Sequence, residues 1–378
     1  MTRCRRAGGR LVVVVVALGA VLMAACSPDP DAARLASGSR SSEPPTSTSA
    51  SGPPPSTIGP TTTVATTTTP APTTTAAPTT TAPPVLMQLT GLPAPDPLVA
   101  LRRALVVKID NHPQARPQFG LNAADIVYEE NVEGLTRFAA VFHSTDAERV
   151  GPIRSARTQD VSLLGSLNKP LFAWSGGNAG TTAALRESDL VDVGPYAVGG
   201  SVYYRDQRED ESLEHTLYSG TDRLWRQAPD GLSPPPPHFE YRSPGEAVRG
   251  EASSGVAIAM DGVDVTWRWD GASGLYLRSQ NGREHQDATL GQVSAANVVV
   301  LEVDYRPSPA DEKSPEAQTV GQGAAWVHTG GELVRGSWQR VDRSDVFTLV
   351  DVAGRSIRLT PGRTWVELAR DGRVAPVV

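Results

Sequence analysis

Carboxylates, arginines and His215 occur together between residues 110 and 215, and these residue types suit two kinds of chemistry. Four are candidates for acid–base catalysis, because paired carboxylates or a carboxylate beside a histidine can move protons: Asp110, Glu129, Glu130 and His215. Six are candidates for holding an anion or a glycan: Asn111, Arg116, Arg137, Arg154, Arg157 and Asp160. Arg154 and Arg157 precede an expected helix, where guanidinium groups and backbone N–H groups can bind carboxylate or phosphate.

The same side chains could instead form a buried ion-pair network that fixes a hairpin to a helix. Catalysis requires at least two of the carboxylates in one open cleft, one of them with a raised pKa. His215, beside Glu214, can be a general base or a loop histidine satisfied by hydrogen bonds. The sequence leaves these interpretations open. No histidine spacing indicates a metal site, and no cofactor motif is present, so we expect neither a metal nor a cofactor.

Short apolar runs predict the elements that position these residues. Strands are expected at 104–110, 124–130, 135–143 and 171–174, with the second and third joined as a hairpin. Helices are expected at 156–168, 178–187 and 221–227, the last with Thr221 as its N-cap. This pattern predicts a mixed α/β arrangement.

The later sequence alternates between apolar and polar residues, with turn residues every 8–12 positions. It predicts strands at 263–270, 275–280, 297–305, 324–328, 332–340, 345–351, 356–360 and 364–368. The fold class expected is therefore α+β: a mixed α/β N-terminal domain followed by a β-rich C-terminal domain, an antiparallel sandwich or barrel. Its tryptophans lie on the alternating face, which favours a core role over a sugar-stacking platform.

The N-terminus has the pattern of an export signal. Four arginines precede an apolar run at 11–25 that ends in Ala24 and Ala25, directly before Cys26. This resembles a bacterial lipobox and predicts lipidation of Cys26, for example with palmitate. A transmembrane anchor or an ordinary secretory signal is the alternative, but the run is short for a membrane span of roughly 20 residues. We therefore expect an extracytoplasmic protein held by lipid at the outer face of the cell membrane.

Composition divides the rest of the chain. Residues 26–88 are rich in Ser, Thr, Pro and Ala and predict a disordered tether. An α/β domain at 89–232, a Pro-rich linker at 233–250 and a β-rich domain at 251–378 follow. Loss of the four signal arginines takes the formal charge from −6 to −10, which argues against nucleic acid as a partner. Cys4 and Cys26 are the two cysteines, which excludes cysteine-dependent catalysis in the mature domains.

Two early stretches carry a resemblance to a known family, KIDNHPQARPQFGLNAADIVYEENVEGLTRFAAVF (108–142) and VGPIRSAR (150–157), and three later ones match its C-terminal part: REHQDATLGQVSAANVVV (283–300), AAWVHTGGELVRGSWQR (324–340) and RLTPGRTWVEL (358–368). They resemble the YerB-like family of bacterial lipoproteins, a domain of unknown function with N- and C-terminal parts. The resemblance covers nearly all of 89–370. It implies a membrane-anchored extracytoplasmic protein and no established reaction. The family motifs fall on the polar residues named above and also on Lys108, Pro117, Asp125, Tyr128, Thr136, Ser175 and Gly176.

Three functions are compatible with these observations. The leading expectation is a non-enzymatic binding or scaffold protein of the cell envelope, with peptidoglycan, its precursors or a wall-synthesis protein as partner. A hydrolase or transferase acting on wall glycan is the second, and a solute-binding lipoprotein with a cleft between its domains is the third.

Overall fold

The strands that carry the candidate residues form one side of a long sheet. A computed structural model describes residues 84–209 and 211–377; Cys26, the signal segment 1–25 and residues 26–83 of the tether lie outside the described residues. The N-terminal part supplies β1 (Leu105–Asp110), β2 (Ile126–Val132), β3 (Leu135–Phe142), β4 (Leu171–Ala173) and β5 (Val191–Asp192). β2 and β3 form the expected antiparallel hairpin, β3 pairs with β1, and β4 and β5 follow β1 in parallel.

Short helices and turns connect these strands. The α-helices are α1 (Gln159–Leu163), α2 (Ala179–Glu187), α3 (Pro195–Val198) and α4 (Thr221–Trp225). The 3₁₀ turns are η1 (Val99–Leu101), η2 (Pro113–Ala115), η3 (Leu121–Ala123), η4 (Gly165–Leu167), η5 (Gly200–Val202) and η6 (Leu213–His215), and β6 (Tyr204–Arg205) pairs with β7 (Leu217–Tyr218). Every residue of β1 and β2 is buried, because the sheet is covered on both faces.

The C-terminal part is β-rich, as predicted. Its strands are β8 (Glu251–Ala252), β9 (Gly255–Met260), β10 (Val263–Asp270), β11 (Leu275–Gln280), β12 (Arg283–Glu284), β13 (Gln286–Asp287), β14 (Gly291–Gln292), β15 (Ser294–Ala295), β16 (Asn297–Glu302), β17 (Tyr305–Ser308), β18 (Asp311–Ala317), β19 (Gly321–Thr329), β20 (Glu332–Arg340), β21 (Thr348–Asp351), β22 (Thr364–Ala369) and β23 (Val374–Pro376). A second sheet has the order β12-β11-β10-β9-β23.

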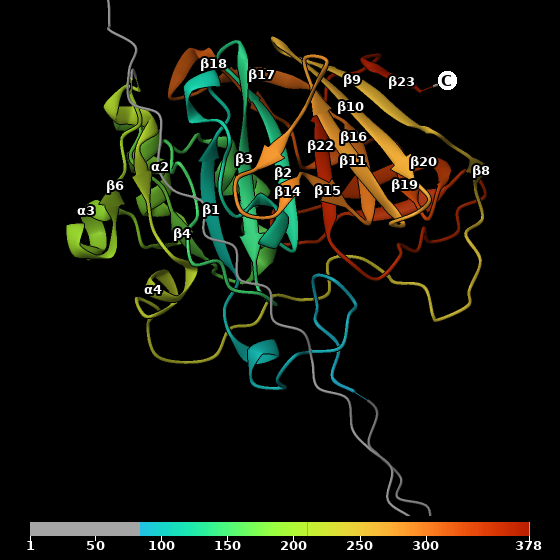
Figure 1. Cartoon of the computed structure of the whole chain (residues 1–378), viewed down its shortest axis with the longest axis horizontal. Coiled ribbons are helices and arrows are strands. Elements are labelled where there is room, and N and C mark those ends of the chain that lie inside the picture. The colour runs from blue at the N-terminus through green and yellow to red at the C-terminus, as the bar shows by residue number, and fades with distance from the viewer. Residues whose placement is uncertain (1–83, 210, 378) are drawn as a thin grey trace, which may run out of the picture. The chain divides into compact units, whose positions relative to one another are not determined.

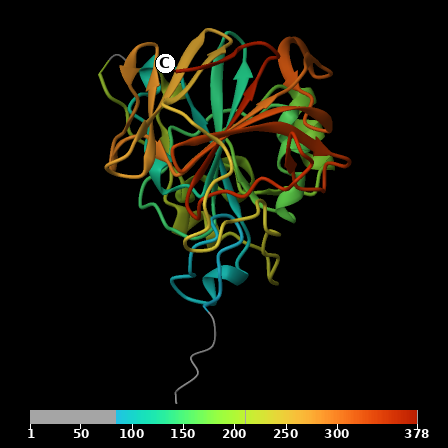
Figure 2. The ribbon, with the colours of Figure 1, turned by 90° about the vertical axis from the view of Figure 1, so that its right-hand side faces the viewer.

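One sheet runs through both parts of the chain. Its strand order is β21-β20-β19-β16-β22-β2-β3-β1-β4-β5, and its strands fan out in Figure 2. β22 joins the two parts, because it pairs in parallel with β16 on one side and with β2 on the other. The expectation of a purely antiparallel C-terminal part is therefore wrong. The described residues belong to one compact unit, and the division into two domains stays a prediction.

Three local predictions are corrected. The helix expected at 156–168 is limited to α1 and η4, and Asn168 ends it with a left-handed φ of 55°. Gly220, not Thr221, is the N-cap of α4. Residues 356–360 are not a strand: isolated bridges at Ser356 and Leu359 hold this segment.

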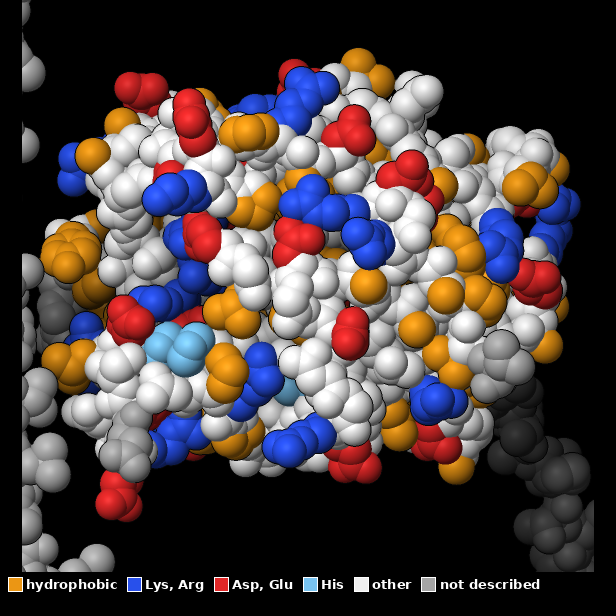
Figure 3. Space-filling view, turned by 90° about the horizontal axis from the view of Figure 1, so that it is seen from above, with side chains coloured by type: hydrophobic (Ala, Val, Ile, Leu, Met, Phe, Trp, Pro, Cys, Tyr) orange, Lys and Arg blue, Asp and Glu red, His pale blue; other side chains and the backbone are white. Residues whose placement is uncertain are grey.

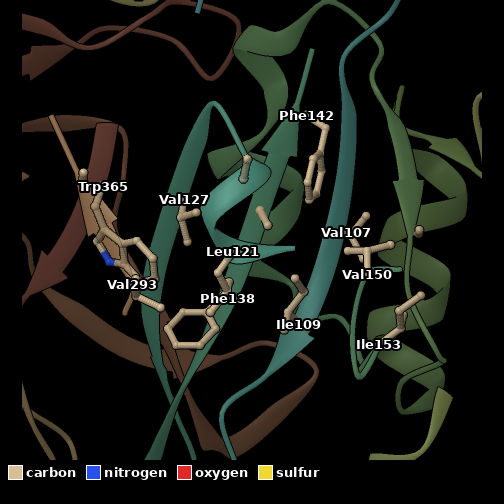
Figure 4. Close-up of a cluster of buried hydrophobic side chains, with 14 of the residues drawn as sticks. Val107, Ile109, Leu121, Val127, Phe138, Phe142, Val150, Ile153, Val293 and Trp365 are labelled. Carbon is tan, nitrogen blue, oxygen red and sulfur yellow. The ribbon is translucent and has the colours of Figure 1, made fainter. Parts of the chain in front are cut away.

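Large aromatic side chains fill the interior between the sheets. Figure 4 shows Phe138 and Trp365 packed near Val293, with their ring centroids 5.3 Å apart. Trp267 and Trp338 are buried as well, which confirms their predicted core role. The Pro-rich segment also contacts the core: His238 is buried, and the Tyr241 hydroxyl donates to the carbonyl of Leu89.

The chain enters the described fold at one end and carries the candidate residues at the other. Residues 84–103 lie at the bottom of Figure 1, and β1 rises from them to end in Asp110 at the opposite side. β4 and β5 run parallel to β1, so their carboxyl ends meet there too. Within 84–209 and 211–377, no helix has the length and apolarity needed to cross a membrane.

Candidate functional site

The predicted site residues separate into a closed interior group and a rim group at the carboxyl ends of β1 and β4, in which Asp110 and His215 are buried and Arg154 and Arg157 are about a fifth exposed. Register explains the separation, because alternate residues of a strand point to opposite faces of the sheet. Lys108 and Glu130 meet on one face, Glu129 lies on the other, and Asp110 ends β1 at the rim. The two groups have different electrostatics.

One half of the closed group is an ion-pair cluster around Lys108. Its ammonium donates to Glu130 and, at 2.8 Å, to Asp160 Oδ1, and all three side chains are buried. The second oxygen of Asp160 accepts the backbone N–H of Arg157 at 2.7 Å. Burial, and then the charge of Asp160, raises the pKa of Glu130 to about 7. This cluster fixes β1 and β2 to the start of α1.

The other half of the closed group surrounds Glu129 and joins the two parts of the chain. Arg278 Nη2 donates to both Glu129 oxygens at 2.8 and 2.7 Å. Thr136 Oγ1 and Trp365 Nε1 donate to the same carboxylate at 2.7 and 3.2 Å. We call Glu129, Arg278, Thr136 and Trp365 the Glu129 cluster. Its four bonds satisfy the carboxylate, as a buried charge requires.

Three further buried residues, Glu367, His285 and Asn111, surround this cluster. Burial, and then the nearby charge of Glu129, raises the pKa of Glu367 well above its ordinary value. Burial, and then Arg278, lowers the pKa of His285 far below its ordinary value, and His285 Nδ1 lies 2.6 Å from Arg278 Nη1. Asn111 is buried here and donates to Gln280 Oε1 at 3.0 Å.

Two of the catalytic candidates and two of the binding candidates are closed off from solvent. Glu129 and Glu130 are fully buried and paired with cations, so they do not share an open cleft. Asp160 and Asn111 are closed in the same way. Glu129, Glu130 and Asp160 thus lie in buried ion pairs, and Asn111 is hydrogen-bonded beside them.

Asp110 and His215 form a pair at the rim, although 105 residues separate them. His215 Nδ1 lies 2.5 Å from Asp110 Oδ2, and Arg154 Nε lies 3.2 Å from the same oxygen. His112 stacks flat on His215, with centroids 4.3 Å apart and planes 3° apart. Glu214 completes the group, 3.5 Å from His215 Nε2. Among the described residues His215 has no hydrogen bond to a hydroxyl, so no Ser–His–Asp relay is formed.

Three arginines lie together beside this pair. Arg154 pairs with Asp110 and with Glu214, and Arg157 makes a bidentate pair with Glu133 at 2.9 and 2.6 Å. We call Arg137, Arg154 and Arg157 the arginine cluster.

Arg137 differs from its two neighbours. Only 6% of it is exposed, its Nη1 donates to the carbonyl of Ser155 at 2.9 Å, and its Nε is buried without a partner. No carboxylate of the described residues forms an ion pair with it. Burial, and then the charge of Arg157, lowers the pKa of Arg137 to about 10.

A pocket of about 630 Å³ adjoins the arginine cluster. Ser155, which accepts from Arg137, lines it, as does the loop at Gly176 that follows β4. Carboxyl ends of parallel strands are where α/β sheets bind ligands. The face that contains this site carries Lys and Arg side chains interspersed with Asp and Glu and with histidine (Figure 3).

Sequence reasoning found some of these residues and missed others. It named Asp110, His215, Arg137, Arg154 and Arg157, which the fold brings to one rim. Arg116 is separate, since it donates to Asn111 Oδ1 and to the Asn111 carbonyl. The pocket residues Trp174, Arg186 and Tyr196 were not singled out, although the Gly-Gly turn after β4 was a usable signal. Within the described residues, no group of three His, Cys, Asp or Glu is arranged to hold a metal ion.

Comparison with protein families identifies the chain. The model described as "Protein of unknown function (DUF3048) N-terminal domain" matches residues 89–232, and the model of the DUF3048 C-terminal domain matches residues 256–366. The chain belongs to the DUF3048 family. The resemblance found in the sequence is thereby confirmed.

Relatives of the DUF3048 chain agree with this assignment. "Putative lipoprotein YerB" of Bacillus subtilis (strain 168) is 28% identical over 291 residues, which is 75% of this chain and 86% of that protein. The crystal structure of the YerB protein from Bacillus subtilis matches with a TM-score of 0.68 at 24% identity. That match covers 78% of this chain and all of the other, and it shows that the two share a fold.

Proposed function

We propose that this DUF3048 protein is a lipid-anchored extracytoplasmic binding or scaffold protein of the cell envelope that recognises an anionic group of a wall component at the arginine cluster. The lipobox at Cys26 and the name of the Bacillus relative support the anchor. The Ser/Thr/Pro-rich tether supports a position away from the membrane. The candidate site supports it too, since it lies at the opposite end of the fold from residues 84–103.

The unpaired, buried charge of Arg137 is the observation that carries the binding proposal. Burying a guanidinium costs free energy unless a counter-charge or a full set of hydrogen bonds offsets it. The neighbouring acids make their ion pairs elsewhere: Asp110 with His215 and Arg154, Glu133 with Arg157, and Glu130, which lies opposite Arg137 on β2, with Lys108. A ligand carboxylate or phosphate would supply the missing charge, in the bidentate geometry that guanidinium groups favour.

A second function is favoured by one further observation. The pocket beside the cluster is lined by both parts of the chain, with Gly176 and Trp174 from the N-terminal part and Asp311 and Ser314 from the C-terminal part. A ligand-sized pocket between the parts is what a solute-binding lipoprotein would need. The glycan hydrolase loses support, because Glu129 and Glu130 are closed off.

The test measures thermal unfolding of the full chain in detergent, with and without acidic muropeptides. A ligand that binds the folded state raises its midpoint. We expect a rise with the wild-type protein and none with Arg137→Met. The control is Arg335→Met, at a largely exposed pair with Glu251 far along the sheet, which should keep the response. No rise with any acidic fragment, or an unchanged rise in Arg137→Met, would refute the proposal.

A further inference from the structure

The pocket beside the arginine cluster has a different chemistry from the cluster itself. Its charged lining residues are Arg157, Arg186, Glu133, Asp192 and Asp311, so acids and bases nearly balance. Such a lining does not select a simple anion by charge. It offers both hydrogen-bond donors, the guanidinium groups, and hydrogen-bond acceptors, the carboxylates. These are suited to the hydroxyl and amide groups of a neutral ligand.

Aromatic rings border the same space. Tyr196, on α3, is 88% exposed and lines the pocket. Its ring lies beside the turn after β4, where a Cβ built on Gly176 would be 3.8 Å from Tyr196 Cε2. Trp174 is nearly buried below, and its Nε1 donates to Asp192 Oδ1 at 2.7 Å. An exposed tyrosine beside a glycine turn presents an open apolar ring face next to polar groups.

Several polar groups remain available around these rings. Asp192 Oδ1 accepts from both Trp174 and the Gly194 amide, and its Oδ2 has no partner among the described residues. Arg186, at the end of α2, likewise has no hydrogen-bond or ion-pair partner in the described part of the chain. The Asp192 carboxylate, an acceptor, and the Arg186 guanidinium, a donor, thus line the same pocket as the Tyr196 ring.

We propose that this pocket is a saccharide subsite, in which a sugar ring stacks on Tyr196 while Asp192 and Arg186 bond its hydroxyl or acetamido groups. The inference rests on the proposed function and names its ligand class: a glycan whose acidic substituent reaches the arginine cluster. The volume of about 630 Å³ is in the range of small-molecule sites. Ser155 lines the pocket and its backbone carbonyl accepts a hydrogen bond from Arg137, so the pocket and the arginine cluster are adjacent.

The experiment uses the full chain in detergent and measures the affinity of a neutral probe, the trimer of β-1,4-linked N-acetylglucosamine, by calorimetry. Acidic muropeptides form a second arm. We expect the wild-type protein to bind the neutral trimer, and Tyr196→Ala to bind it about tenfold more weakly, since a stacking contact has about this effect. Arg186→Met should weaken it further, while Tyr196→Trp should retain binding. Tyr196 is exposed, so its removal leaves the core intact.

A matched control replaces an equally exposed apolar residue away from the pocket, Val352→Ala, which should bind as the wild type does. Failure of the trimer to bind, or unchanged binding by Tyr196→Ala, would overturn the saccharide subsite. The two proposals fail separately. Muropeptide binding lost only in Arg137→Met would leave the anion site standing without a sugar subsite, whereas trimer binding with no response to acidic substituents would refute the anion site.

Discussion

The Glu129 cluster and the arginine cluster use the same residue types and differ in how their charges are matched. In the Glu129 cluster a single guanidinium faces a carboxylate that accepts four hydrogen bonds, with no exposure to solvent. In the arginine cluster three guanidinium groups lie together, and Arg137 makes no ion pair within the described residues, although Asp110 and Glu133 lie close enough for their charges to act on it. In the first cluster each charge has a counter-charge within the folded chain. The second has an unmatched positive charge beside a pocket.

The difference separates a structural role from a binding role. A closed ion pair, in which Arg278 Nη2 bonds both oxygens of Glu129, holds β2 and β22 against the second sheet, and removal of one partner leaves a buried charge. An unmatched cation near a pocket lowers the stability of the free protein and provides attraction for a ligand. Position in a family motif does not separate the two roles, because Glu129 and Arg137 both lie in the same matched stretch.

The largest expected effect is a loss of stability on breaking the Glu129 cluster. Arg278→Met leaves Glu129 buried without its cation and should lower the free energy of unfolding by about 3–5 kcal/mol. Urea unfolding of the full chain measures it. Arg335→Met, at an exposed pair, should cost less than about 1 kcal/mol. The double variant Arg278→Met/Glu129→Gln should be more stable than Arg278→Met alone; a cost equal to that of Arg335→Met would show that the cluster is not structural.

His285 tests the same cluster through pH. Its pKa is far below the ordinary 6.5 because of burial first and Arg278 second, so the unfolded chain takes up a proton below pH 6.5 that the folded chain does not. Stability must therefore fall as the pH falls below 6.5, at up to about 1.4 kcal/mol per pH unit from this group. His285→Gln should remove that part of the slope between pH 6.5 and 5. His112→Gln, at the open rim, should change it much less; equal slopes for both variants would contradict the assignment.

Whether a contact in these two regions could be predicted from the sequence depends on how far apart its two residues are along the chain. The strands β1, β2 and β3 follow from local apolar runs, and Asp110, Arg154 and Arg157 follow from their positions at strand ends. Arg278 could not be found in this way, because its partner Glu129 is 149 residues away. Alternation places Arg278 on a strand but does not tell which sheet the strand faces.

The pairing of β22 shows the same limit. Its sequence, TWVEL, predicts a strand correctly, but nothing local indicates that it lies parallel between β2 and β16. The shared sheet, and with it the contact of Trp365 with Glu129, depends on that pairing. The pocket is likewise formed by segments from both parts of the chain, so only its Gly-Gly turn was visible in the sequence.

On the open side, Arg137→Met should separate stability from binding. The variant removes a buried charge that has no carboxylate partner, so its free energy of unfolding should stay within about 1 kcal/mol of the wild type or rise. Its affinity for an acidic muropeptide should fall about tenfold or more, since charge-assisted bonds are lost. Urea unfolding and calorimetry on the same preparation measure the two quantities. A loss of stability as large as that of Arg278→Met would show that Arg137 has a structural role like that of the Glu129 cluster.

The smallest expected effect on stability concerns Glu133, the acid that occupies Arg157. Burial by itself would raise the pKa of Glu133, but hydrogen bonds from Arg157 and Ser314 outweigh it and lower the pKa to about 2. The pair therefore stabilises the fold above pH 4.5 and loses this contribution as the pH falls toward 2. About a third of the Glu133 side chain faces solvent, so Glu133→Gln should cost less than about 1 kcal/mol at pH 7. Because the substitution frees a second guanidinium beside the pocket, muropeptide affinity should rise; a fall would mean that Glu133 positions Arg157 for the ligand rather than competing with it.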